Sequence, residues 1–217
     1  MSDKSSIYSR LWGKLFTGSP TISFNKNTVI IEEGETIDRV YYIVSGRVKF
    51  SIITSEGNEK TMYILNKGSV FGDVWAAASR PYFLSATTFT KCTLAYKTPD
   101  DFIAQVSSNP QYMQDWLSYI CEIVEFLVEH ITDITFLDRE ALLRKYLYRL
   151  SFNYGIQTDD GVKLNTRITH QLLADLIGCS RVTISKIMAK LLRTGELIKI
   201  DGYFYIPNIN TFNEEDE

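Results

Sequence analysis

Residues 169–189 constrain the fold more than any other part of the chain. The segment begins with Thr169, which can cap a helix, and it places the small residue Ala174 four positions before Gly178. A small side chain suits the close crossing of two helices, and a glycine suits the sharp turn between them. The side of the second helix predicted to be buried carries Ile184, Ile187 and Leu191. The segment therefore predicts a helix-turn-helix.

The next segment predicts a β-hairpin, because two β-prone runs, 197–200 and 203–206, flank the turn Asp201-Gly202. A helix-turn-helix followed by a hairpin is a winged helix. The exposed side of its second helix is basic and carries short polar side chains, which suits entry into the major groove, and Lys190 extends this side. The residues expected to contact DNA are Thr169, His170 and Gln171 at the phosphate backbone, and Ser180, Arg181, Val182, Thr183, Ser185 and Lys186 on the second helix. The alternative is a generic helical hairpin with a solvated basic face.

Charge is distributed unevenly along the chain. Residues 139–210 hold 11 lysine and arginine residues against 6 acidic ones, whereas residues 1–138 hold 12 against 16. Only the C-terminal part is therefore expected to meet a polyanion such as double-stranded DNA. The sequence has no signal peptide and no apolar run of bilayer length, so we expect a cytoplasmic protein without a membrane partner. The three scattered cysteines predict no disulfide framework and no metal site.

Short runs rich in β-branched and aromatic residues occupy residues 22–98 and are separated by glycine turns about every ten residues. This spacing predicts a sandwich or barrel. The pattern changes at Pro99, where a short helix can begin, and Asn109-Pro110 then starts a long helix that runs to about Leu137. Asp138 is a suitable N-cap for a further helix, residues 139–154. Residues 155–166 are expected to form a polar connection.

The long helix carries three stripes of side chains. Steps of three and four residues separate the members of the first, as in a coiled coil, which predicts pairing with a second copy. This seam holds Met113, Leu117, Ile120, Val124, Leu127, Ile131 and Ile134. A second stripe, expected to face the barrel, holds Trp116, Tyr119, Ile123, Phe126 and His130. A third, expected to face water, holds Asp115, Ser118, Glu122, Glu125, Glu129 and Asp133. The alternative is a core helix inside a monomer.

Residues 25–206 resemble the family of the cyclic-AMP receptor protein and the fumarate–nitrate reduction regulator. The resemblance rests on the order of the elements and on strings such as 42–48 (Tyr-Ile-Val-Ser-Gly-Arg-Val), 136–138 (Phe-Leu-Asp) and 177–181 (Ile-Gly-Cys-Ser-Arg). It implies an α+β fold in three parts: a sensory β-roll like a cyclic nucleotide-binding domain or jelly-roll (1–108), a dimerisation helix with hinge (109–138) and a winged helix (139–217). It also implies a homodimeric transcription regulator, with RNA polymerase as a candidate partner.

The effector motif departs from the family pattern, in which Gly-Glu is followed about ten residues on by Arg-Ser-Ala. Here the sequence has Gly72-Asp73 and then Leu84-Ser85-Ala86, so leucine replaces the arginine that would pair with the cyclic phosphate. We therefore expect no response to cyclic AMP. No cysteine precedes Cys92, which disfavours an iron–sulfur cluster, and neither histidine is well placed as a haem ligand.

A small organic effector is the remaining possibility for the roll, and its identity is unknown. Its expected contacts are Tyr63, Phe71, Gly72, Asp73, Tyr82, Ser85, Ala86, Ile123 and Leu127. Phe89, Trp116, Tyr119 and Phe126 are further candidate walls. Aromatic lining suits an aromatic or phenolic ligand. The alternative is an ordinary packed aromatic core with no effector.

The recognition helix also departs from the family pattern, since Val182 stands where a glutamate is usual and Lys186 replaces an arginine. This resembles the halogenated-phenol-sensing branch and predicts an inverted repeat richer in A/T, because valine can contact a thymine methyl group. Two other classes of protein are alternatives to an effector-controlled regulator. One is an architectural DNA-binding protein with a non-sensing roll. The other is a jelly-roll enzyme, disfavoured because residues 22–98 lack histidine and the chain has no catalytic constellation.

Overall fold

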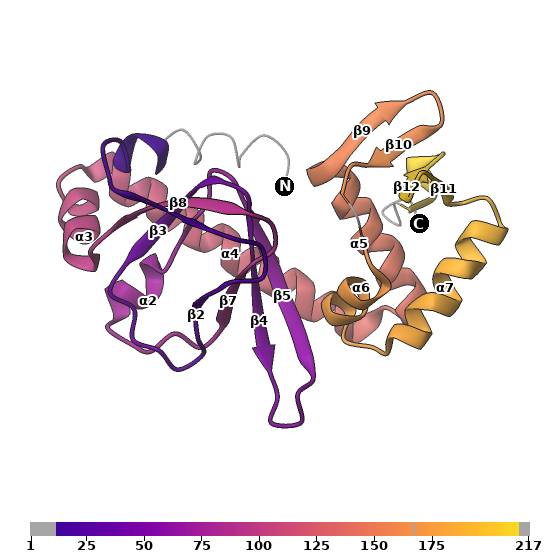
Figure 1. Ribbon diagram of the computed structural model, residues 1–217, viewed down its shortest axis with the longest axis horizontal. Coiled ribbons are helices and arrows are strands. Elements are labelled where there is room, and N and C mark those ends of the chain that lie inside the picture. Colours follow the sequence, from indigo (N-terminus) through magenta and orange to yellow (C-terminus); the bar gives the residue numbers. More distant parts are fainter. Residues whose placement is uncertain (1–11, 167, 213–217) are drawn as a thin grey trace. The chain divides into compact units, whose positions relative to one another are not determined.

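The computed structural model describes residues 12–166 and 168–212 (Figure 1). The chain forms two compact units, residues 1–126 and 127–217, and the division between them falls inside the long helix α4 (Pro110–Phe136). The class is α+β, as the sequence predicts. The first unit contains the β-roll, and the second contains the helix-turn-helix with its hairpin.

Two four-stranded antiparallel sheets form the roll, with the strand orders β1-β8-β3-β6 and β2-β7-β4-β5. The strands are β1 (Thr21–Phe24), β2 (Val29–Ile31), β3 (Val40–Ser45), β4 (Arg47–Ile53), β5 (Glu59–Asn66), β6 (Val70–Phe71), β7 (Ser85–Thr88) and β8 (Cys92–Lys97). Alternate residues face inward, as their burial shows for Val48 and Phe50 in β4 and for Ala86 and Thr88 in β7. These strands surround one apolar core that includes Ile43, Phe71 and Leu94.

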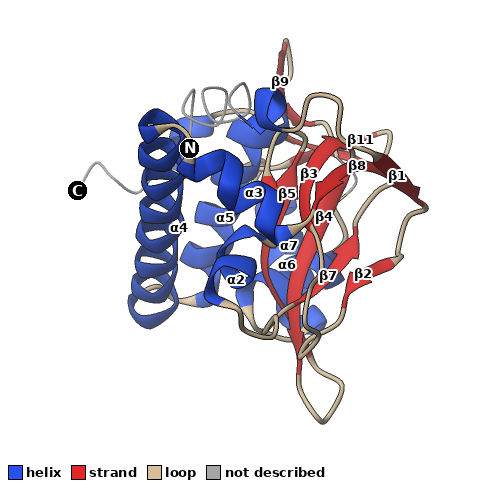
Figure 2. Ribbon diagram, turned by 90° about the vertical axis from the view of Figure 1, so that its left-hand side faces the viewer, coloured by secondary structure: helices blue, strands red, loops and turns tan. Residues whose placement is uncertain are grey.

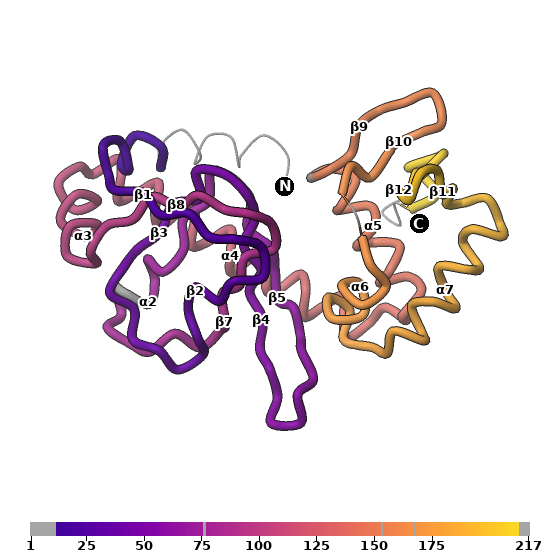
Figure 3. The backbone as a smooth tube through the Cα atoms, in the orientation of Figure 1, coloured from indigo at the N-terminus to yellow at the C-terminus, as the bar shows by residue number. Residues whose placement is uncertain are grey.

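Glycines make the turns of the roll, as the sequence predicts. Gly46 joins β3 to β4 with φ of +91°, and a Cβ atom there would lie 2.3 Å from the carbonyl oxygen of Lys91. Only glycine fits such a position. The expected hairpin around Glu56-Gly57 connects β4 to β5, and its loop can be followed in Figure 3.

The first unit also contains the helices α2 (Asp73–Ala78) and α3 (Pro99–Ser107), and its second core includes residues of α3 and α4. Trp12, Leu15 and Phe16 are buried in it with Phe102 and Trp116. The helical turn at residues 12–15 was not predicted, because Trp12, Leu15 and Phe16 have helical spacing over a stretch too short to identify a helix.

Helix α4 is continuous over its whole length (Figure 2), and one side of it is apolar and exposed. Exposed fractions range from 40% to 59% for Leu117, Val124, Val128, Ile131 and Ile134. Four of these five belong to the predicted seam, and Val128 was not in it. The seam residues Met113 and Ile120 instead pack against the second core of the first unit, and Leu127 is half-buried.

The prediction that Asp133 faces water is wrong. Asp133 is only 4% exposed, because Lys145 and Arg149 of α5 (Arg139–Tyr154) pair with its carboxylate at 2.7 and 2.9 Å. Glu129 pairs with the same Arg149 at 2.5 Å. The prediction that His130 faces the barrel is also wrong, because His130 is buried against α5, where its Nδ1 lies 2.9 Å from the hydroxyl of Tyr146.

Asp138 caps helix α5 in the second unit, as predicted. Its carboxylate accepts hydrogen bonds from the backbone N–H groups of Glu140 and Ala141, both at 2.8 Å. The prediction of a polar connection at 155–166 is wrong. This segment forms two strands. Val162 and Lys163, in the second of these strands, form backbone pairs both with the first strand and with residues 205 and 206 of the C-terminal hairpin. The sheet has the order β11-β12-β10-β9. Its strands are β9 (Gly155–Thr158), β10 (Gly161–Leu164), β11 (Ile198–Ile200) and β12 (Tyr203–Ile206), and a 3-10 turn, Ile209–Phe212, follows.

Candidate nucleic-acid interface

The helix-turn-helix consists of α6 (His170–Ile177) and α7 (Arg181–Arg193). The predicted turn is present, since Gly178 ends α6 with φ of +77° and its N–H donates to the Ala174 carbonyl at 2.8 Å. Each helix has a side-chain cap. Thr169 Oγ1 accepts from the N–H of Leu172 at 3.1 Å, and Ser180 Oγ accepts from the N–H of Thr183 at 3.0 Å. These caps fix where both helices begin.

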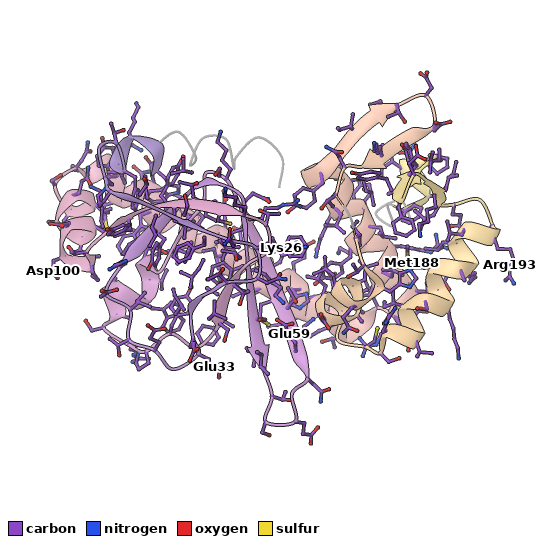
Figure 4. All side chains as sticks on the ribbon, viewed as in Figure 1. Lys26, Glu33, Glu59, Asp100, Met188 and Arg193 are labelled. Carbon is purple, nitrogen blue, oxygen red and sulfur yellow. The ribbon has the colours of Figure 1, made fainter. Side chains whose placement is uncertain are left out.

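The underside of α7 is apolar and buried, which holds the helix against the rest of the second unit. Ile184, Met188 and Leu191 are fully buried, whereas Ile187, expected on this side, is half-buried. Figure 4 shows Met188 on the inner side of α7 and Arg193 pointing outward at its C-terminal end. The buried positions orient the opposite face toward solvent.

That opposite face is a shallow, open hollow lined by Arg181, Val182, Ser185, Lys186 and Ala189. Four of these were predicted from the sequence, and Ala189 was missed because alanine carries no chemical signal. Val182 is 63% exposed. Cationic ends beside a small apolar centre match what a major groove offers, namely acceptor atoms of guanine and methyl groups of thymine. We refer to these five residues as the α7 face.

Four further predicted DNA contacts, namely His170, Gln171, Ser180 and Thr183, make hydrogen bonds inside the motif. His170 Nδ1 lies 2.9 Å from Ser185 Oγ, and the Gln171 amide donates to Asp175 at 2.7 Å. The hydroxyls of Ser180 and Thr183 are 2.9 Å apart. Lys190 donates to both carboxylate oxygens of Glu140, at 2.8 and 2.7 Å. Lys190, predicted to extend the basic side of the second helix, is therefore paired with Glu140 of α5.

Several predicted effector contacts come together inside the roll. Tyr63, Phe71 and Tyr82 pack into one core, with Phe50 stacked on Tyr63 at 4.8 Å between ring centroids. Asp73, the first residue of α2, is fully buried there, and its Oδ2 accepts from Trp116 Nε1 at 2.7 Å. Burial raises the pKa of Asp73, and the Trp116 N–H opposes that shift only in part.

The other predicted effector residues are less closely associated with this cluster. Ala86 belongs to the same apolar core, and Ser85 accepts from the backbone N–H of Glu33 at 3.3 Å. Gly72 has φ of +87° and directly precedes Asp73. Ile123 is half-buried on α4 in the first unit, while Leu127 belongs to the second unit.

The described ranges hold no group of three or more His, Cys, Asp and Glu side chains placed to bind a metal ion. Of the helices in those same ranges, none combines the length and apolar character needed to cross a bilayer.

Comparison with known proteins accounts for both units. Residues 21–109 match the cyclic nucleotide-binding domain, and residues 143–214 match the Crp-like helix-turn-helix domain. The two matches together cover most of the chain, and the cyclic nucleotide-binding domain precedes the helix-turn-helix domain. The chain belongs to the CRP/FNR family of transcription regulators. As a member of this family it is a DNA-binding regulator and not an enzyme.

Relatives within the CRP/FNR family are named for different signals. The CRP-like cAMP-activated global transcriptional regulator of Mycobacterium tuberculosis is 25% identical over 181 residues, which is 83% of this chain and 80% of that relative. The c-di-GMP responsive regulator CLP of Xanthomonas campestris superposes with a TM-score of 0.79 at 19% identity, over 92% of this chain and 99% of that one. Similarity alone therefore does not select an effector.

The halogenated-phenol-sensing branch is represented by CprK in complex with OCPA. It superposes with a TM-score of 0.71 at 17% identity, over 94% of this chain and 92% of that one. At this identity the likeness extends to the fold alone, so the similarity to this branch, which rests on Val182, stays a prediction.

Proposed function

We propose that this CRP/FNR regulator acts as a homodimer that binds an inverted repeat in DNA through the α7 face of each copy, and that its roll does not respond to cyclic AMP. The observation that carries the proposal is the α7 face itself. Arg181, Val182 and Lys186 are exposed on one side of a helix whose other side is buried. A helix held in this way can enter the major groove without unfolding any part of the domain.

The homodimer is supported by the apolar side of α4. Leu117, Val124, Val128 and Ile131 follow one another at steps of seven, four and three residues and are all more than half exposed. A contiguous exposed apolar surface of this kind is typical of an interface, and its spacing is that of a helix pair. A second copy of the same helix, in parallel, is the occupant that the pattern fits.

Within the complex, Arg181 is positioned to donate to guanine and Val182 to contact a thymine methyl group. Two α7 helices related by twofold symmetry address half-sites about one helical turn, or ~34 Å, apart. We expect an inverted repeat that is richer in A/T than the site of the cyclic-AMP receptor protein, because valine cannot accept a hydrogen bond from cytosine.

The absence of a cyclic-AMP response is supported by two features of the roll. Leu84 is buried where the family pattern has an arginine, so a cyclic phosphate would lose its guanidinium partner. Asp73, in place of the usual glutamate, is already engaged by Trp116. Leaving a buried phosphate unpaired costs about 3–5 kcal/mol, which is enough to abolish micromolar binding. The half-buried Tyr63 and the buried Tyr82 beside Asp73 suit a small organic effector of aromatic or phenolic type.

A second candidate is a constitutive DNA-binding protein with a non-sensing roll. The favouring observation is that Tyr82, Phe71 and Trp116 are all buried against the chain's own side chains. DNA affinity that stays constant across a panel of small molecules that bind the roll would favour this candidate over an effector-controlled regulator.

The proposed interface can be tested by fluorescence anisotropy with Arg181→Ala and, as a matched control, Arg193→Ala, which removes the same charge from the same helix outside the α7 face. We expect Arg181→Ala to weaken binding to a selected duplex by about 1–3 kcal/mol and to relax base preference. Arg193→Ala should alter binding less and leave base preference unchanged. Equal effects of both variants would contradict the assignment. Calorimetric detection of micromolar cyclic-AMP binding would contradict the expectation for the roll.

A further inference from the structure

His170 connects the two helices of the motif through a chain of hydrogen bonds. Its Nδ1 lies 2.9 Å from Ser185 Oγ, and the Ser185 hydroxyl donates to the carbonyl oxygen of Arg181 at 2.9 Å. A hydroxyl has one proton to donate. With that proton on the Arg181 carbonyl, Ser185 Oγ accepts from His170 Nδ1–H. The nitrogen left to gain or lose a proton is then Nε2.

The charged groups that act on His170 are cations. Burial lowers the pKa of the imidazole, and Lys199 of β11 and Arg181 of α7 lower it further. Asp175, the acidic residue of α6, accepts a hydrogen bond from Gln171 one turn away and is not among the groups that shift this pKa. In the free protein at neutral pH, His170 is therefore mainly uncharged. The negative charge of an approaching polyanion would favour the protonated form of His170 instead.

We propose that His170 takes up one proton at Nε2 from solvent when DNA binds, and that the resulting imidazolium donates Nε2–H to a backbone phosphate. This inference rests on the proposed DNA-binding function. The phosphate supplies the negative charge that offsets Lys199 and Arg181, so the charged imidazole becomes the favoured form in the complex. Ser185 acts as a positioning residue, because its hydroxyl oxygen fixes the ring through Nδ1.

Coupling of one proton to binding has a defined consequence for affinity. Where the bound form holds the proton and the free form does not, affinity changes at most about tenfold per pH unit. Between about pH 8 and pH 6, we expect affinity to rise roughly three- to thirtyfold as pH falls, at constant ionic strength. Because phosphate contacts do not depend on base identity, the same rise is expected for mixed-sequence DNA.

The experiment measures binding of the full chain to a fluorescein-labelled, mixed-sequence duplex by anisotropy across this pH range. We expect His170→Gln to fold normally by circular dichroism, to bind DNA, and to lose the pH dependence. The chain has one other histidine, and His130→Gln serves as the matched control that keeps the dependence. Lys199→Gln removes a cation that disfavours the charged ring, so the affinity rise should shift to higher pH, which a purely structural role would not produce.

A second measurement detects the proton itself. Calorimetric titrations in two buffers of different ionisation enthalpy should give uptake approaching one proton per His170 in the wild-type chain near pH 7 and none attributable to this residue in His170→Gln. Equal pH profiles in these two proteins would overturn the inference while leaving DNA binding intact. Failure of the wild-type chain to bind any duplex at any pH would instead overturn the proposed function on which the inference rests.

Discussion

Replacing Trp116 by phenylalanine tests the contact that joins α4 to the roll within the first unit. The change removes the N–H that donates to Asp73 Oδ2 at 2.7 Å and leaves a smaller ring in a site that is 7% exposed. Loss of a hydrogen bond to a buried carboxyl group costs about 1.5–3 kcal/mol, and the void adds about 1 kcal/mol. We expect the free energy of unfolding of this unit to fall by about 2.5–4 kcal/mol.

Tryptophan fluorescence during urea unfolding isolates this effect. All three tryptophans, Trp12, Trp75 and Trp116, lie in the first unit, so the signal does not report on the second. A double-mutant cycle with Asp73→Ala, which removes the acceptor, separates the hydrogen bond from the lost packing, and its coupling energy should be about 1–3 kcal/mol. A loss below about 1 kcal/mol for Trp116→Phe, or a coupling near zero, would refute this explanation.

The contribution of Asp73 to the free energy of unfolding depends on pH, and the sign of this dependence follows from the pKa shift of its carboxyl group. Burial raises the pKa of Asp73 in the folded state, so its contribution to stability is most favourable below the unfolded-state value and declines as pH rises through the folded-state pKa. Asp73→Asn removes this titration. We expect the stability of Asp73→Asn relative to wild type to improve between about pH 4 and pH 7. A difference that is constant over this range would show that the carboxyl group is not perturbed.

Three further predictions concern the interfaces and the second unit. Ile131→Asp places a charge on the exposed side of α4 and should convert the dimer to monomer at micromolar concentration in sedimentation velocity runs; an unchanged sedimentation coefficient would argue against the α4 seam. Val182→Glu should move base preference toward G/C by about tenfold in competition binding, and an unchanged preference would remove Val182 from the base contacts. The hydrogen bond from Lys190 lowers the pKa of Glu140 despite opposing burial, so its stabilising contribution is present above about pH 4.5 and is lost as pH falls through the folded-state pKa. Glu140→Gln should therefore flatten the acid branch of the stability profile measured by circular dichroism, and an unaltered slope would contradict this role.

The winged helix could be predicted from local patterns because its determinants are close together in sequence. Thr169 and Ser180 cap the helix that follows each of them, and Gly178 makes the turn between the two helices. The roll was predictable for the same reason, since glycine turns such as Gly46 separate its strands. Periodicity on α4 likewise identified four of the large apolar residues that stay exposed there, Leu117, Val124, Ile131 and Ile134.

The features that sequence patterns missed depend on contacts between distant residues. Asp73 and Trp116 are 43 positions apart, and nothing local to either predicts their hydrogen bond. Asp133 has the spacing of a solvated residue, and its burial follows from two cations that α5 supplies. The strands at 155–164 are short and polar, so pairing with the wing, rather than their own propensity, decides their conformation.

Selection of duplexes from a random DNA pool by the full-length chain, followed by sequencing, tests the central claim most directly. We expect enrichment of an inverted repeat whose half-site centres lie about 10 base pairs apart, with more A/T than the site of the cyclic-AMP receptor protein. Enrichment of a single unrepeated site, or no enrichment at all, would contradict the proposal that two α7 faces bind one duplex. Recovery of the G-rich half-site would contradict the base preference assigned to Val182.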